Sequence, residues 1–124
     1  MSTCHGHTRW VRAVAAMPDG QRSLSGARDH TVRVWLVDGT HQNTFWLHFH
    51  WVFALVALPD NQHALAASRG ATVKLFNVND GAVLRTFKHH TRWVDCLALL
   101  PDGLRFVSGS EDETARIVYH GLAR

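Results

Sequence analysis

The chain has 124 residues and a mass of 13.9 kDa, which is the size of one small domain. Hydrophobic residues make up 46% and charged residues 19%, and this mixture excludes a globally disordered chain because it can form an apolar core. No stretch reaches the length of about 20 apolar residues that a membrane span needs, and residues 1–6 lack the apolar run of a secretory signal. The net charge of +3 comes from scattered basic residues, which disfavours a nucleic-acid-binding arm.

The two cysteines, Cys4 and Cys96, form no CxxC pair and recur with no spacing. Small secreted domains tend to be rich in cysteine, so this usage favours a reduced chain inside the cell. A cytoplasmic location is favoured over a nuclear one, and no membrane partner is expected.

Short strands separated by turns are predicted from the first part of the chain, at residues 10–17, 21–27, 31–37 and 42–46. The Pro-Asp-Gly sequence at 18–20 favours a turn, because Pro fixes φ, Asp hydrogen-bonds its own backbone and Gly accepts a positive φ. Residues 31–35 alternate between two faces, as a strand does, and no helical period fits these segments. Together the four strands predict one antiparallel unit.

The same landmarks return twice more along the chain. Residues 7–11 (His-Thr-Arg-Trp-Val) reappear at 90–94, with a weaker copy at 48–52, and the spacings are 41 and then 42 residues. The Pro-Asp turns at 18–20, 59–61 and 101–103 keep these spacings, and so do the strand motifs at 31–35, 72–76 and 114–118. Three landmarks in one register establish repeats of about 6–46, 47–87 and 88–124. The third copy stops after its third predicted strand, near Tyr119.

These repeats resemble the WD40 repeat family, which has a period of about 40–45 residues and a Gly-His…Trp-Asp signature. Residues 6–7 match the Gly-His element, residues 24–29 and 106–112 resemble the second strand and turn, and residues 31–35 resemble the third strand. The Trp-Asp dipeptide itself is absent, since Leu36 follows Trp35. The resemblance covers nearly all of residues 1–124. It implies an all-β fold of WD40-like β-propeller blades, built as about three antiparallel four-stranded units in an incomplete ring.

An incomplete ring has a consequence for assembly. Propellers usually close with about 4–8 blades, because closure protects the strand edges. Two arrangements are therefore expected to cover the open blade faces. In the first arrangement, two chains associate head to tail into a six-bladed ring. In the second, the chain is one part of a longer propeller.

His7, Ser25 and Asp29 have the residue types of a hydrolase triad, but no GxSxG elbow accompanies them. The WD40 resemblance implies a structural hydrogen-bond network instead, in which Asp29 holds His7, His7 holds Ser25, and Ser25 reaches the indole of Trp35. Such a network pairs buried polar groups with one another. The chain is therefore expected not to be an enzyme.

The other two copies depart from this pattern. The third copy retains His90, Ser108 and Asp112 but has Val118 in the tryptophan position, so its network is expected to be one member shorter. The second copy has Ala66 in the serine position and a glycine in the aspartate position, so its network is expected to be absent and its blade to be the loosest.

Ten histidines suggest a metal site at first, with pairs at 5 and 7, at 48 and 50, and at 89 and 90. All three pairs fall at the same phase of the repeat, so they lie on successive blades and do not converge on one ion. A zinc site needs three or four ligands around one point. No metal and no cofactor are expected.

The loops that enter each blade and those between its second and third strands are expected to share one face of the propeller. Arg and Trp are enriched at the energetic centres of interfaces, although packing between blades is the simpler explanation for the tryptophans of these loops. We predict a non-enzymatic scaffold that binds a protein partner through this face; the alternative is a nucleic-acid or anion-binding module that uses the same Arg and Trp loops. The candidate partner-binding residues are Arg9, Trp10, Arg28, His50, Arg69, Arg92, Trp93 and Glu111.

Overall fold

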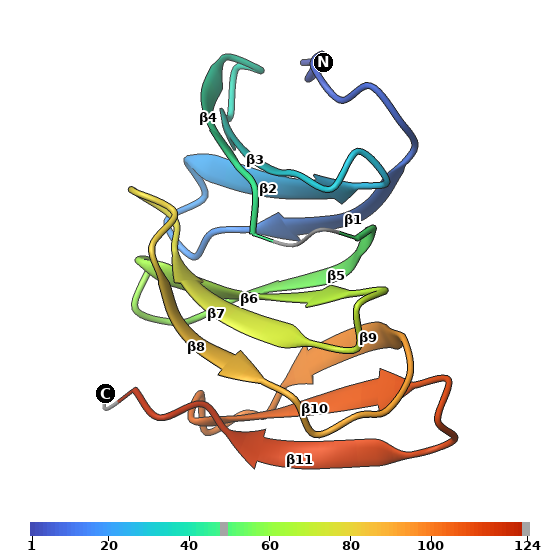
Figure 1. Ribbon diagram of the computed structural model, residues 1–124. Coiled ribbons are helices and arrows are strands. Elements are labelled where there is room, and N and C mark those ends of the chain that lie inside the picture. Colours follow the sequence, from blue (N-terminus) through green and yellow to red (C-terminus); the bar gives the residue numbers. More distant parts are fainter. Residues whose placement is uncertain (48–49, 123–124) are drawn as a thin grey trace.

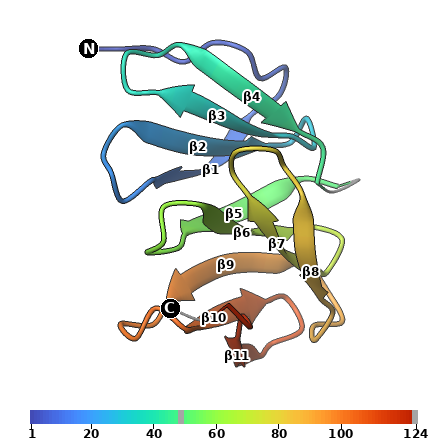
Figure 2. The same cartoon turned by 90° about the vertical axis from the view of Figure 1, so that its left-hand side faces the viewer.

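The computed structural model of the chain describes residues 1–47 and 50–122 and contains three antiparallel β-sheets. The sheets are stacked one after another in sequence order (Figure 1, Figure 2). Among the described residues, no helix is long and apolar enough to cross a membrane. The predicted all-β fold of antiparallel units is confirmed.

Each sheet is a meander in which the strands pair in sequence order. The first sheet contains β1 (Val11–Ala16), β2 (Arg22–Ala27), β3 (Val32–Leu36) and β4 (His41–Phe45). The second contains β5 (Val52–Ala57), β6 (His63–Ser68), β7 (Val73–Asn77) and β8 (Val83–Phe87). The third contains β9 (Val94–Leu99), β10 (Arg105–Ser110) and β11 (Ala115–Tyr119). The third sheet thus has three strands, as the sequence predicts.

The Pro-Asp turns join the first two strands of each sheet. In the first turn the Asp19 carboxylate accepts a hydrogen bond from the backbone N–H of Gln21 at 2.9 Å, and Gly20 has a φ of 70°. Asn61 takes the same left-handed conformation in the second turn, with a φ of 60°. Asn is one of the few residues other than Gly that tolerates this conformation, so the turn survives the substitution.

Two apolar clusters hold the sheets together, one on each side of the second sheet. Successive side chains of a strand point to opposite faces, and β6 therefore contributes Ala64 and Ala66 to one cluster and Leu65 and Ala67 to the other. Burial on both faces explains why β6 is apolar along most of its length. The first cluster contains Met17, Leu24, Val32, Val34, Leu47, Val52, Leu55, Ala64, Ala66, Phe76 and Val78. The second contains Leu58, Leu65, Ala67, Val73, Leu75, Val94 and Phe106.

The first and third sheets lie at opposite ends of the stack, and the three sheets do not close into a ring (Figure 1). Each end leaves apolar side chains in solvent, with Val14 73% and Ile117 63% exposed. Trp35 also faces away from the second sheet, but it is only 2% exposed because the N-terminal segment passes over it. Gly6 lies so close to this indole that an added Cβ would meet Trp35 Cη2 at 3.1 Å, and it would meet Arg33 Nη1 at 2.6 Å.

Candidate functional site: two buried polar networks and an exposed binding face

The first sheet carries a continuous chain of hydrogen bonds. The indole Nε1–H of Trp35 donates to Ser25 Oγ at 2.7 Å, and Ser25 Oγ lies 2.6 Å from His7 Nε2. His7 Nδ1 lies 2.8 Å from Asp29 Oδ2. An indole can only donate, so the Ser25 hydroxyl hydrogen is directed to His7 Nε2, and the His7 Nδ1–H donates to Asp29. The side chains of Trp35, Ser25, His7 and Asp29 are therefore paired with one another within the blade.

Asp29 is the charged end of this network. Burial alone would raise the pKa of its carboxyl, but hydrogen bonds from Thr31, His7 and the backbone N–H of Thr8 outweigh it and hold the pKa below its ordinary value. The carboxylate is therefore ionised at neutral pH and fixes the turn that joins β2 to β3.

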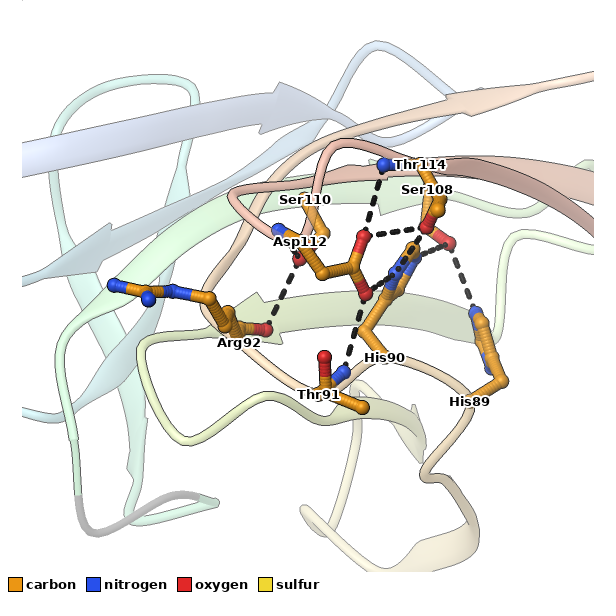
Figure 3. Close-up of polar contacts among 8 residues, drawn as sticks. All are labelled: His89, His90, Thr91, Arg92, Ser108, Ser110, Asp112 and Thr114. Atoms are coloured by element: carbon orange, nitrogen blue, oxygen red, sulfur yellow. Dashed lines mark hydrogen bonds and ion pairs between the residues drawn. The ribbon is translucent and has the colours of Figure 1, made fainter.

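The third sheet contains an equivalent network with a different donor at its end (Figure 3). His90 Nδ1 lies 2.8 Å from Asp112 Oδ2, and His90 Nε2 lies 2.7 Å from Ser108 Oγ. His89 Nε2 lies 2.9 Å from the same serine oxygen. The prediction that this network is one member shorter is wrong. Val118 cannot donate a hydrogen bond, and the imidazole of His89 bonds to Ser108 as the indole of Trp35 bonds to Ser25 in the first sheet.

Asp112 and His89 form the acidic end and the basic end of the network in the third sheet, and the fold lowers the pKa of each. The Thr114 hydroxyl donates to the Asp112 carboxylate, and with the hydrogen bonds from His90 and from the backbone N–H of Thr91 it holds the pKa of Asp112 well below its ordinary value. Burial lowers the pKa of His89, and the neighbouring His90 and Arg116 lower it further, against the attraction of Asp112. His89 is therefore held in its neutral, single-donor form.

The second sheet has no counterpart of these networks among its described residues. Ala66, in the serine position, is fully buried and has no hydroxyl, and Gly70 replaces the aspartate. The Ser68 hydroxyl instead accepts a hydrogen bond from the backbone N–H of Gly70 at 3.1 Å. The predicted histidine of this copy, His48, and its neighbour at 49 lie outside the described residues.

Burial decides what the His-Ser-Asp groups can do chemically. Ser108 is 0% and Ser25 is 7% exposed, and each hydroxyl both donates and accepts inside its network. A nucleophilic serine has to reach its substrate and needs an oxyanion hole beside it. The geometry suits a role in fixing the turns. Within residues 1–47 and 50–122, no group of three His, Cys, Asp or Glu side chains is placed to hold a metal ion.

A different arrangement of polar and aromatic side chains lies at the loops that enter β1, β5 and β9 and at those that follow β2 and β6. These loops lie at the right-hand side of Figure 1, and we call this side the loop edge of the sheets. The guanidinium carbon of Arg28 lies 4.4 Å from the ring centre of Trp10 and 4.0 Å from that of Trp51. The guanidinium carbon of Arg69 lies 4.6 Å from the ring centre of Trp51 and 4.4 Å from that of Trp93. These five residues alternate cation and indole across all three sheets, and we call them the tryptophan–arginine ladder.

Backbone hydrogen bonds set the ladder's spacing. The N–H of Arg28 donates to the carbonyl of Trp10 at 3.0 Å, and the N–H of Arg69 donates to that of Trp51 at 2.9 Å. Each arginine is thus tied to the tryptophan of its own sheet, while its side chain also reaches the tryptophan of the next sheet. In the third sheet Glu111 has the same backbone bond, to Trp93 at 3.0 Å, and the ladder ends there because this position holds no cation.

The remaining candidate residues surround the ladder without joining it. Arg9 and His50 are exposed, and Arg92 and Glu111 form a loose ion pair with Nη2 and Oε1 3.8 Å apart. The Arg92 side chain extends away from the buried network, as Figure 3 shows. Trp51 is half-buried at the centre of the ladder, although it is not among the predicted partner-binding residues. The offset of 41 residues between Arg28 and Arg69, the same as between Trp10 and Trp51, is the sequence signal for this alternation.

Two hollows lie at opposite edges of the sheets. One, of about 490 Å³, lies beside the ladder and is lined by Arg9, Trp10, Arg28, His30 and Trp51. The other, of about 470 Å³, lies at the Pro-Asp turns between the second and third sheets, where residues 58–60 meet residues 101–104. There, hydrogen bonds from the backbone of Leu104 and from Arg105 lower the pKa of Asp102 to about 2. The hollow lined by Arg9 and Arg28 thus lies on the loop edge, and the one lined by Asp60 and Asp102 lies on the opposite edge.

Comparison with known proteins gives a consistent picture. Residues 1–35 and 81–118, more than half of the chain, match the family described as WD domain, G-beta repeat (WD40). The structure is similar to the crystal structure of the WD40 beta propeller domain of Doa1, with a TM-score of 0.86 and 30% sequence identity. This likeness covers 93% of the chain but only 38% of the Doa1 chain, so the present chain spans well under half of that domain. No match was found among curated proteins.

Proposed function

The chain belongs to the WD40 repeat family, and from this premise we propose that it is a non-enzymatic scaffold that binds a protein partner through the face bearing the tryptophan–arginine ladder. WD40 propellers generally act as protein-interaction scaffolds, which supports the general class. The choice of face rests on this chain's own residues.

The observation that carries the choice is the ladder itself. It collects three tryptophans and two arginines on one edge, and these residue types dominate the energetic centres of protein interfaces. Trp10 is 68% exposed at one end, so the ladder is open to a partner. The His-Ser-Asp networks, in contrast, pair their polar groups inside the blades.

Two further elements of the proposal concern assembly and location. The exposed apolar ends of the stack, including Val14 and Ile117, favour coverage by a second copy or by further blades. Light scattering tests self-association, and a single species of 13.9 kDa would contradict it.

Cys4 and Cys96 are both exposed free thiols, which suits the reducing interior of a cell.

An affinity experiment tests the choice of face. The tagged full chain, a Trp10→Ala/Arg92→Glu double variant and an opposite-edge Arg105→Glu control are each used to retain proteins from a lysate, which are identified by mass spectrometry. We expect a set of proteins that the wild-type chain and the control retain and the double variant loses. Retention that all three share equally would contradict this face, and no retention by any of them would contradict the scaffold function.

A further inference from the structure

We propose that the outward edge of the tryptophan–arginine ladder binds an extended acidic segment of a protein partner, with two of its carboxylates seated on Arg28 and Arg69. This inference rests on the proposed function, because it names the chemistry of the partner on the same face. Four features of the structure lead to it.

The first feature is the unused hydrogen-bonding capacity of the two arginines. A guanidinium has five N–H donors in its plane, and stacking between indoles covers its faces but leaves its edges free to donate. Among the described residues, neither Arg28 nor Arg69 forms an ion pair, and Arg28 Nε is buried without a hydrogen-bond partner. Carboxylates match this geometry, since they accept two parallel bonds from one guanidinium.

The second feature is what the indoles can and cannot offer. Arg28 and Arg69 both lie over the Trp51 ring, with their guanidinium carbons 4.0 Å and 4.6 Å from its centre, so they compete with a nucleic-acid base for stacking on it. The ring edges remain, and the edge of an aromatic ring is its electropositive part. The outward side of the ladder is therefore a row of guanidinium donors and electropositive ring edges. This row favours an anion and disfavours stacking of bases.

The third feature is space beside the first arginine. The hollow of about 490 Å³ is lined by Arg28 and by the indoles of Trp10 and Trp51, which lie on either end of its cation–π contacts, together with Arg9 and His30. This volume admits a carboxylate side chain together with some water. Arg9 adds a second positive charge at the same place, and it is exposed.

The fourth feature is a match of spacing and polarity. Both guanidinium carbons lie within 4.6 Å of the centre of the Trp51 ring, so they are at most about 9 Å apart. Side chains at positions i and i+2 of an extended chain share one face and lie about 7 Å apart. Glu111 stands where a third arginine would continue the row, and its charge, together with its pairing to Arg92, limits the cationic part to the first two sheets.

Fluorescence anisotropy with a labelled octaglutamate peptide tests the inference on the full chain. At low salt, about 50 mM, we expect saturable binding that weakens as salt rises, and no comparable binding of octaglutamine. Arg28→Lys and Arg69→Lys should each weaken octaglutamate binding by about tenfold or more, because lysine keeps the charge but loses the stacked planar fork. The matched control Arg105→Lys, on the opposite edge, should bind as the wild type does.

Three results would overturn the inference: no saturable binding of octaglutamate by the wild-type chain, unchanged binding by both lysine variants, or tighter binding of an oligothymidylate of equal length. If a lysine variant fails to fold, as judged by its thermal unfolding, the salt dependence and the peptide comparison on the wild-type chain still decide. Failure here is distinguishable from failure of the proposed function. Proteins lost selectively by the Trp10→Ala/Arg92→Glu variant would keep this face as the binding face and reject only its acidic ligand.

Discussion

The two polar groupings of this molecule use their hydrogen bonds in opposite ways. In the His-Ser-Asp networks the hydroxyls, imidazoles and carboxylates bond to one another, and Ser108 is wholly buried. In the ladder the guanidinium groups of Arg28 and Arg69 lie over indoles, and among the described residues neither forms an ion pair. The group that resembles a catalytic site is thus part of the internal architecture. The group made of ordinary binding residues is the one with free capacity for a ligand.

The largest expected effect comes from breaking a network. Ser108→Ala leaves the ring nitrogens of His89 and His90 without their shared partner, and an unpaired buried polar group costs about 1–3 kcal/mol of unfolding free energy. Urea denaturation measures this, with the exposed Ser2→Ala as the control. Octaglutamate binding should stay unchanged under folding conditions. Unchanged stability would show that the network does not hold the blade.

A smaller loss of stability is expected from breaking the ladder at its centre. Trp51→Leu removes two cation–π contacts, each worth about 0.5–1 kcal/mol at a partly exposed site. It should also weaken octaglutamate binding, because Arg28 and Arg69 lose the ring that orients them. Trp46→Leu is the matched control, since Trp46 is 71% exposed and lies outside the ladder. Equal effects of the two substitutions on binding would mean that the ladder does not orient the arginines.

The smallest effect concerns the donor that differs between the two networks. The fold lowers the pKa of His89, so the unfolded chain takes up a proton there first as pH falls below the ordinary value of 6.5. The wild-type chain should therefore lose stability from this residue as the pH falls from about 7 through the ordinary value of 6.5. His89→Gln keeps an N–H donor but cannot titrate, so its thermal unfolding should depend less on pH over this range. His5→Gln, at an exposed position, should retain the wild-type slope.

The sequence predicts the strands well, because they rest on local chemistry repeated in register, whereas the first network is expected from the resemblance to WD40 repeats. The Pro-Asp turns and the alternation at residues 31–35 require no knowledge of neighbouring blades. The role of His89 could not be predicted this way. It depends on where the ring turns once Val118 leaves the donor position empty. The arginines and tryptophans of the ladder repeat at the same offset in the sequence, but their contacts could not be predicted, since each arginine reaches a tryptophan of the next sheet and this contact exists only once the sheets stack.

The indole N–H signals of the five tryptophans offer the most direct test of the central claim, that ligands bind at the ladder and not at the networks. In a ¹⁵N-labelled full chain, addition of octaglutamate should shift the indole signals of Trp10, Trp51 and Trp93. The signal of Trp35, whose N–H is bonded to Ser25, should stay in place and exchange slowly with solvent. A shift confined to Trp35, or no shift of the three ladder indoles at saturating peptide, would contradict the claim.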